Sequence, residues 1–221
     1  MSLARCGALA ALLVAGAARA EDAAPPGLTW RDVGLFAGGA ATAFVAHEAG
    51  HLAANLALGN VPHVEQVRFL GAVPFFAVAP DITCSGDLCL RRDGSPFGPG
   101  RKGLLLILLA GFDVQHATDE ALLTRDPQLR SRGASFCTGL LAFNTLTSVA
   151  YAIGNLAGIE PSAGDLSDAV RDARASRLLT TGLLLGVAFA DVARWAFPEA
   201  AWLAWVSRAA KVAFLGLPLT V

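Results

Sequence analysis

Two histidines and a glutamate stand close together in the sequence, at His47, Glu48 and His51, where the chain reads H-E-A-G-H. Residues four apart lie on one face of an α-helix, so both imidazoles can reach one ion if this segment is helical. Zinc binds neutral imidazole nitrogen readily, and the intervening glutamate can take a proton from water beside the metal. The pattern therefore predicts Zn²⁺ bound by His47 and His51, with Glu48 as the catalytic general base.

The segment that holds this pattern is long and apolar, and we predict a helix over residues 31–58. Thr29 and Asp32 have the spacing of a capping box at its start. At about 1.5 Å per residue, the two histidines lie about 10 and 17 Å from the C-terminal end of the helix. A carboxylate such as Glu48 at that depth in a bilayer is costly unless it is paired or functional. We therefore expect the site to lie within the membrane.

A catalytic zinc usually has three protein ligands, so a third ligand must come from elsewhere. Asp165 is the first candidate, because it follows a predicted helix over 133–156. Because successive predicted spans cross the membrane in opposite directions, that helix ends on the side of the membrane where the histidine pair lies. The alternatives that stay open are Asp168 one turn further on, Asp113 and His116 in an apolar segment, His63 in a loop, or no third ligand.

The composition indicates a protein that lives in a lipid bilayer. Hydrophobic residues make up 54% of the 221 residues, charged residues only 16%, and the mean hydropathy is +0.53. Soluble domains are typically about 25% charged. The net charge of −1 and the isoelectric point near 6.4 argue against a nucleic-acid partner. The partners we expect are the lipid bilayer and a transmembrane protein substrate.

The pattern of apolar segments predicts an all-α polytopic membrane protein with four to five transmembrane helices and a short β-containing loop after the first. Two short strands are expected in that loop, over 64–69 and 74–78, joined around Gly71. Polar loops are expected over 119–132 and 157–177. The predicted helices are 31–58, 103–118, 133–156, 178–197 and, as a fifth span or an interfacial helix, 199–221.

The amino terminus has the features of a secretory signal peptide over residues 1–20, with cleavage after Ala20. An uncleaved signal anchor is the alternative. An exposed leader over 21–30 then precedes a membrane-embedded, metalloprotease-like domain over 31–221. Five Lys and Arg residues lie in 59–102, more than in the other predicted loops, which predicts that this segment is cytoplasmic. We expect an integral protein of a bacterial inner (cytoplasmic) membrane.

Two further pairs of side chains bear on these predictions. Cys84 and Cys89 lie in the loop that we expect to be cytoplasmic, and a disulfide between them would require an oxidising compartment and contradict that orientation. A thiol pair or a weak metal site is the alternative. Asp191 and Arg194 are three residues apart on a predicted helix, so we expect them to pair with each other.

Three segments together resemble the intramembrane zinc metalloproteases of the site-2 protease family, over about residues 33–175. They are HEAGHLAANLALGN, the β-like VEQVRFLGAVPFFAV and the stretch from Asn155 to Asp165. The resemblance implies that Asp165 is the third zinc ligand and that Asn155, with Asn144 on the same helix, binds substrate. The third segment departs from the family pattern, because its Pro is displaced and its Asp comes two residues late.

These features favour a membrane-embedded zinc metalloendopeptidase that cleaves a peptide bond in or near a transmembrane segment. A catalytically inactive zinc- or client-binding membrane protein of the same fold is the alternative. A membrane di-iron oxidase would need more than the four histidines present. A soluble metzincin would need Gly and His where this chain has Ala54 and Ala57.

Overall fold

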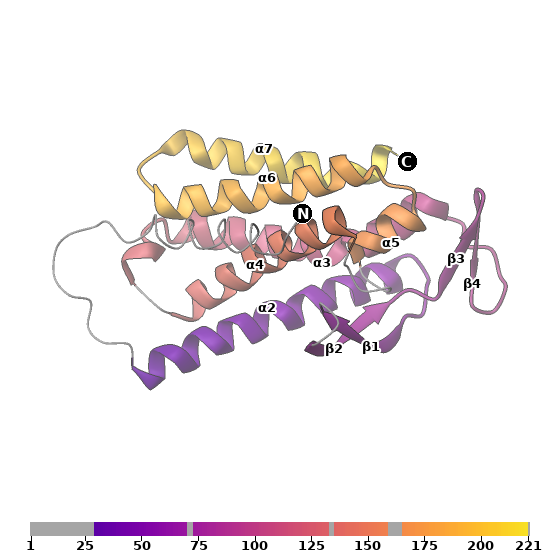
Figure 1. Ribbon diagram of the computed structural model, residues 1–221, viewed down its shortest axis with the longest axis horizontal. Helices are drawn as coiled ribbons and strands as arrows, with labels where there is room; N and C mark the ends of the chain where they lie inside the picture. Colours follow the sequence, from indigo (N-terminus) through magenta and orange to yellow (C-terminus); the bar gives the residue numbers. More distant parts are fainter. Residues whose placement is uncertain (1–28, 70–72, 133–134, 159–164, 221) are drawn as a thin grey trace.

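The computed structural model describes residues 29–69, 73–132, 135–158 and 165–220. The predicted signal peptide and nearly all of the predicted leader lie outside these residues. Five long helices lie along the longest axis of the molecule, and short strands gather at one end of it (Figure 1). The prediction of a mostly helical chain with a β-containing loop after the first long helix is confirmed.

The helices begin and end close to where the sequence predicts. The capping box at the first long helix is confirmed, because the Thr29 and Asp32 side chains each bond to the other's backbone N–H. The Ser135 and Ser176 side chains cap two later helices by accepting a hydrogen bond from the backbone N–H three residues on. The helices are α2 (Trp30–Ala57), α3 (Gly100–Arg125), α4 (Phe136–Ala157), α5 (Asp165–Arg171), α6 (Arg177–Ala196) and α7 (Ala201–Leu215), with 3-10 turns at Leu129–Arg132 and Leu217–Thr220.

Two parts of the helical prediction are wrong. The helix α3 continues to Arg125 instead of ending at 118, and the short helix α5 lies in a segment that we expected to be a loop. The last turns of α3 are polar, which is why the sequence predicts a loop there. In the structure, Glu120 and Thr124 accept hydrogen bonds from side chains of α6 and α7. The side chain of Leu166 in α5 is fully buried, so this short helix packs against the rest of the bundle.

The strands form two antiparallel hairpins between α2 and α3. The first pairs β1 (His63–Phe69) with β2 (Val73–Ala79), and its two strands confirm the prediction. The second pairs β3 (Ile82–Ser85) with β4 (Leu88–Arg91) and was not expected.

A disulfide joins Cys84 to Cys89, which face each other across the second hairpin. Disulfides persist in oxidising compartments and are rare in the cytosol. The disulfide therefore argues against the cytoplasmic location predicted for 59–102 from its Lys and Arg residues. Several of these basic side chains bond within the molecule. Arg91, for example, donates to the carbonyl oxygens of Gly59 and Pro96.

The helix α3 forms the centre of the bundle and is buried on most of its surface. It contacts α2, α4, α5, α6 and α7. The first half of α3 is apolar nearly all round, and such a helix is stable only when other elements cover it, as happens here. The fully or almost fully buried apolar side chains of that half are Leu104, Leu105, Ile107, Leu108, Leu109 and Phe112.

Glycines allow α2 to lie directly against its neighbours. A Cβ at Gly39 would collide with the Phe136 carbonyl of α4, and a Cβ at Gly139 of α4 would collide with the Phe36 carbonyl of α2. A Cβ at Gly50 would lie 2.6 Å from the Ala110 carbonyl oxygen of α3. This close packing fixes the position of α2, and with it the position of its histidines.

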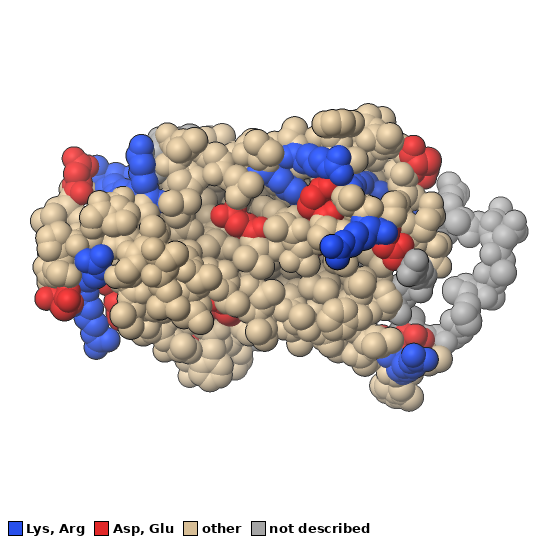
Figure 2. Space-filling view, turned by 180° about the vertical axis from the view of Figure 1, so that it is seen from behind, with Lys and Arg blue, Asp and Glu red and all other residues tan. Residues whose placement is uncertain are grey.

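Two described helices, α4 and α6, are long and apolar enough to cross a membrane. Large apolar side chains are also exposed on the surface of the bundle. Leu146 of α4 is 67% exposed, Leu178 of α6 is 76% exposed and Trp205 of α7 is 71% exposed. The face seen in Figure 2 accordingly has wide uncharged areas between separate groups of charged side chains.

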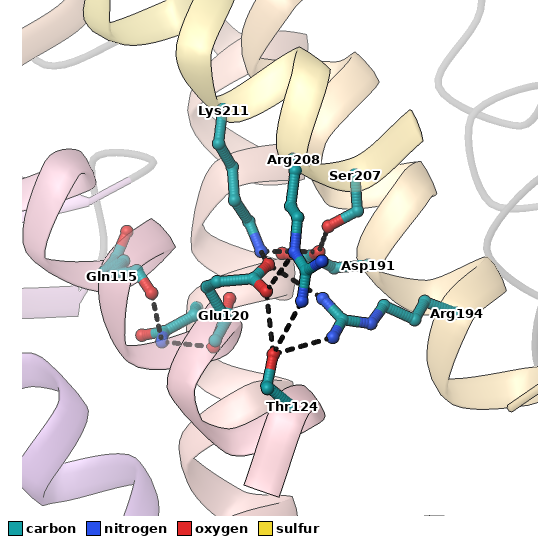
Figure 3. Close-up of polar contacts among 10 residues, drawn as sticks. Gln115, Glu120, Thr124, Asp191, Arg194, Ser207, Arg208 and Lys211 are labelled. Carbon is teal, nitrogen blue, oxygen red and sulfur yellow. Dashed lines mark hydrogen bonds and ion pairs between the residues drawn. The ribbon is translucent and has the colours of Figure 1, made fainter. Parts of the chain in front are cut away.

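Charged side chains from α3, α6 and α7 meet between these helices in what we call the charged cluster (Figure 3). Its members are Glu120, Asp191, Arg194, Arg208 and Lys211. The predicted pairing of Asp191 with Arg194 is wrong. Arg194 pairs with Glu120 at 2.7 Å, and Asp191 pairs with Lys211 at 2.8 Å. Neighbouring helices approach closely enough to offer each group a partner outside its own helix.

Candidate metal centre

The two histidines of α2 and the first residue of α5 bring three possible metal ligands together. His47 and His51 lie one helical turn apart, and their Nε2 atoms are 3.1 Å from each other. Oδ2 of Asp165 lies 3.2 Å from the first Nε2 atom and 3.3 Å from the second. The sequence separates His47 from Asp165 by 118 positions. Of the candidates for a third ligand, Asp165 is the one that the structure places beside both histidines.

These distances match a zinc site. Zinc binds His nitrogen and carboxylate oxygen at about 2.0–2.2 Å, which in a tetrahedron separates neighbouring ligand atoms by about 3.3 Å. The three pairs of ligand atoms here are 3.1, 3.2 and 3.3 Å apart. Two imidazoles and one carboxylate are also a donor set that catalytic zinc uses. The residues present therefore fit a zinc ion with one position left open for water or substrate.

The orientation of the His51 ring is fixed by its second nitrogen. Nδ1 lies 2.8 Å from the carbonyl oxygen of Ile107, which can only accept, so Nδ1 holds the proton and donates it. Nε2 of the neutral ring then has a free lone pair that points toward the site. Gly111 makes room for both rings, since a Cβ there would collide with His51 and His47.

The Asp165 carboxylate is ionised in this setting. With no metal bound, burial opposes its charged form, but the positive charge of a protonated His51 ring and hydrogen bonds from both histidines outweigh burial and hold the pKa of this carboxyl well below its ordinary value. Among the described residues, no Lys or Arg side chain pairs with it. The carboxylate therefore faces two nitrogen bases without a permanent cation beside it.

Glu48 is held next to the site by the first hairpin. Its Oε2 accepts a hydrogen bond of 2.7 Å from the backbone N–H of Val78 in β2. This single bond leaves lone pairs on both carboxylate oxygens for other donors. Glu48 and His47 both line one cavity of about 420 Å³ between α2, β2 and α4. The chain thus presents a base and a possible metal ligand to the same space.

The other candidates for the third ligand lie elsewhere. Asp168 pairs with Arg171 at 2.6 Å, and His63 lies 3.0 Å from a carboxylate oxygen of Asp81. His116 packs its ring edge-to-face against Phe214, and within the described part of the chain neither of its nitrogens has a hydrogen-bond partner. Asp113 likewise has one buried oxygen without a partner there. None of the four belongs to the cluster of ligand atoms around His47.

Both asparagines predicted to bind substrate form hydrogen bonds between helices. Asn155 donates to the Thr181 hydroxyl of α6 at 2.9 Å, and Asn144 donates to the Asp119 carboxylate of α3 at 2.7 Å. Both are almost fully buried, and neither lines the cavity that holds Glu48. This geometry favours a role in holding the helices together.

Sequence reasoning missed three groups that shape the site. They are the Val78 N–H, the Ile107 carbonyl and the missing side chain at Gly111. Two of them are backbone atoms, which every residue type offers, so the sequence holds no signal for them. The glycine is one of 23 in the chain. Only the packing of α3 against α2 makes it different from the others.

A comparison with protein-family models, with curated proteins and with solved structures finds no match for this chain. The functional argument therefore rests on the site itself.

Proposed function

We propose that this chain is a membrane-embedded zinc metalloendopeptidase that cleaves a peptide bond in or near a transmembrane segment of a client protein. The observation that supports the proposal most strongly is the convergence of His47, His51 and Asp165 at the spacing of a tetrahedral zinc site. The resemblance to the site-2 protease family, which rests on the H-E-A-G-H pattern and the segments after it, points to the same chemistry.

The chemistry follows from the roles of the side chains. Zinc, when bound, supplies a positive charge that polarises the substrate carbonyl and the attacking water. Glu48 takes one proton from that water while the oxygen bonds to the carbonyl carbon. The same carboxyl then gives the proton to the departing nitrogen as the carbon–nitrogen bond breaks. The Val78 N–H holds Glu48 in place through both steps.

The proposed membrane topology extends beyond α4 and α6. We infer that α2 and α3 cross beside them, with α7 as a fifth span or an interfacial helix, in a bacterial inner membrane. Asp119 and Glu120 of α3 bond to side chains of other helices, so these two charged groups do not prevent α3 from lying in lipid. The disulfide favours an orientation in which the strands face the oxidising side.

One observation favours the inactive alternative, a zinc- or client-binding protein of the same fold. The asparagines that the resemblance assigns to substrate binding, Asn155 and Asn144, are engaged in bonds between helices. A protein of this kind would bind zinc without cutting its client. Glu48 distinguishes the two proposals, because a base beside the metal is needed only for hydrolysis.

Metal analysis combined with a cleavage assay tests the proposal. Detergent-purified protein should contain about one zinc per chain, and His47→Ala should lose it. The wild type should cleave a single-span substrate whose helix contains a Gly or Pro, since a helical backbone must unwind before its carbonyls are accessible. Leu52→Ala is the control on the same helix, because this side chain is 42% exposed and belongs neither to the cavity lining nor to the ligand cluster; it should keep both zinc and cleavage. Absence of zinc above the His47→Ala level would refute the metal site, and zinc without cleavage would support the inactive alternative.

A further inference from the structure

The cavity beside Glu48 is lined almost entirely by carbon. Aromatic walls come from three different elements, Phe44 of α2, Phe75 of β2 and Phe143 of α4. The rings of Phe44 and Phe75 meet edge-to-face at 6.3 Å, and those of Phe44 and Phe143 at 6.2 Å. The volume of about 420 Å³ lies within the range of pockets that bind small ligands.

The cavity lies beside a close contact between α2 and α4. Gly39 and Gly139 bring the backbones of α2 and α4 into contact. Further along both helices, Phe44 and Phe143 stand between them, while Ala40 and Ala150 contribute only methyl groups to the lining. Large rings and small methyl groups together leave a space that the chain does not fill. Its position is set by the packing of α2 against α4.

The polarity of the lining restricts what can enter. Besides His47 and Glu48, the polar side chains that line it are Thr147 and Tyr151. A peptide backbone placed deep in such a space would lose hydrogen bonds to water without replacing them, which costs free energy for each group. A large apolar side chain has no such loss and gains contact with the aromatic walls.

We propose that this cavity is the specificity pocket of the peptidase and that it takes a large apolar side chain, aromatic for preference, from a residue that flanks the scissile bond. This inference rests on the proposed function. In that proposal His47 holds the zinc that polarises the reacting carbonyl, Glu48 takes the proton from the attacking water, and both residues line the cavity. A side chain that enters the cavity must therefore belong to a residue at or next to that carbonyl.

Matched substrates and a set of variants test the pocket. The substrates are single-span peptides that differ only in Phe or Ala at the position flanking the cleaved bond, on each side in turn. Wild type should prefer Phe by about 100-fold or more in kcat/KM at one of these positions, since a missing methylene alone changes discrimination by about 10-fold or more. Ala150→Leu, which fills the cavity, should lower that preference at least tenfold. Phe143→Ala, which widens it, should shift the preference toward Trp.

Ile153→Phe serves as the control, because it adds bulk on α4 at a side chain that is 41% exposed and does not line the cavity. It should leave the preference unchanged. Zinc content must stay at the wild-type level in all variants.

Equal kcat/KM for Phe and Ala substrates in wild type would refute the pocket proposal and leave the peptidase proposal standing. If zinc-loaded wild type cleaves neither, the peptidase proposal fails. Fluorescence binding of the same peptides to Glu48→Gln then decides the pocket: equal affinity overturns it.

Discussion

Two groups of buried polar side chains lie in the same helical bundle, and they balance their charges differently. In the charged cluster, Glu120 contacts three cationic side chains and Asp191 contacts Lys211 and the Ser207 hydroxyl (Figure 3). In the metal centre, the Asp165 carboxylate lies against two imidazoles, and within the described residues it has no Lys or Arg partner.

This difference separates a structural cluster from a ligand site. A buried carboxylate is stable only when it is neutralised by a proton, a cationic side chain or a metal ion. The charged cluster contains its own cations, so each of its carboxylates has a cationic partner, and its effect is to fasten α6 and α7 to α3. The metal centre lacks a permanent cation, and its geometry matches zinc. We therefore expect the two regions to respond to different perturbations.

The largest expected effect is on the rate of hydrolysis. Glu48→Gln should reduce proteolysis by about 10²–10⁴-fold, because Gln has nearly the same shape but cannot accept the proton. Zinc should stay bound, since His47, His51 and Asp165 are unchanged. Kinetics with a single-span substrate and metal analysis measure both quantities. The matched change in the charged cluster, Glu120→Gln, should retain most of the activity of the folded protein. Equal cleavage by wild type and Glu48→Gln would exclude the proposed mechanism.

The second effect is on zinc affinity. Asp165→Ala should weaken zinc binding by more than about 100-fold, because even residues that only support a ligand are worth 10–100-fold. Asp113→Ala and His116→Ala remove groups outside the ligand cluster and should keep zinc. A chelator should lower the Tm of wild type but not that of Asp165→Ala. Full zinc in Asp165→Ala, with loss in His116→Ala, would move the third ligand to α3.

The same comparison explains which parts of the molecule the sequence could predict. Helix periodicity and the spacing of His47 and His51 are local, so the helices and the histidine pair follow from the sequence. Asp165 was one candidate among several, because only packing brings α5 to α2. The prediction that Arg194 and Asp191 pair with each other was wrong for the same reason. Each has a possible partner three residues away, but neighbouring helices supply others.

The third effect is on stability and concerns the charged cluster alone. Lys211→Met should destabilise the protein by about 3–5 kcal/mol, because it leaves the Asp191 carboxylate buried without its cation. The double variant Lys211→Met/Asp191→Leu removes both charges and should recover much of that loss. Denaturant unfolding measures the free energies, and zinc content should be unchanged in both variants. A loss of zinc without a loss of stability would show that the two regions are not independent.

The smallest effect concerns the disulfide at the end of the molecule where the strands lie. Cys84 and Cys89 close a short loop, so the chain-entropy relation gives about 2 kcal/mol for the cross-link. The double variant Cys84→Ser/Cys89→Ser should lose that amount of unfolding free energy and keep both zinc and cleavage, because neither sulfur contributes to the ligand cluster.

Alkylation of the unfolded wild type should modify two more thiols after reduction than before it. This measurement also decides the orientation, since the disulfide requires an oxidising compartment on the side of the strands. If an alkylating reagent added to cells before lysis modifies Cys84 and Cys89 without prior reduction, the strands face the cytoplasm. The orientation suggested by the Lys and Arg residues of 59–102 would then be restored, and the metal centre would be approached from the reducing side. Protection of both thiols until reductant is added supports approach from the oxidising side.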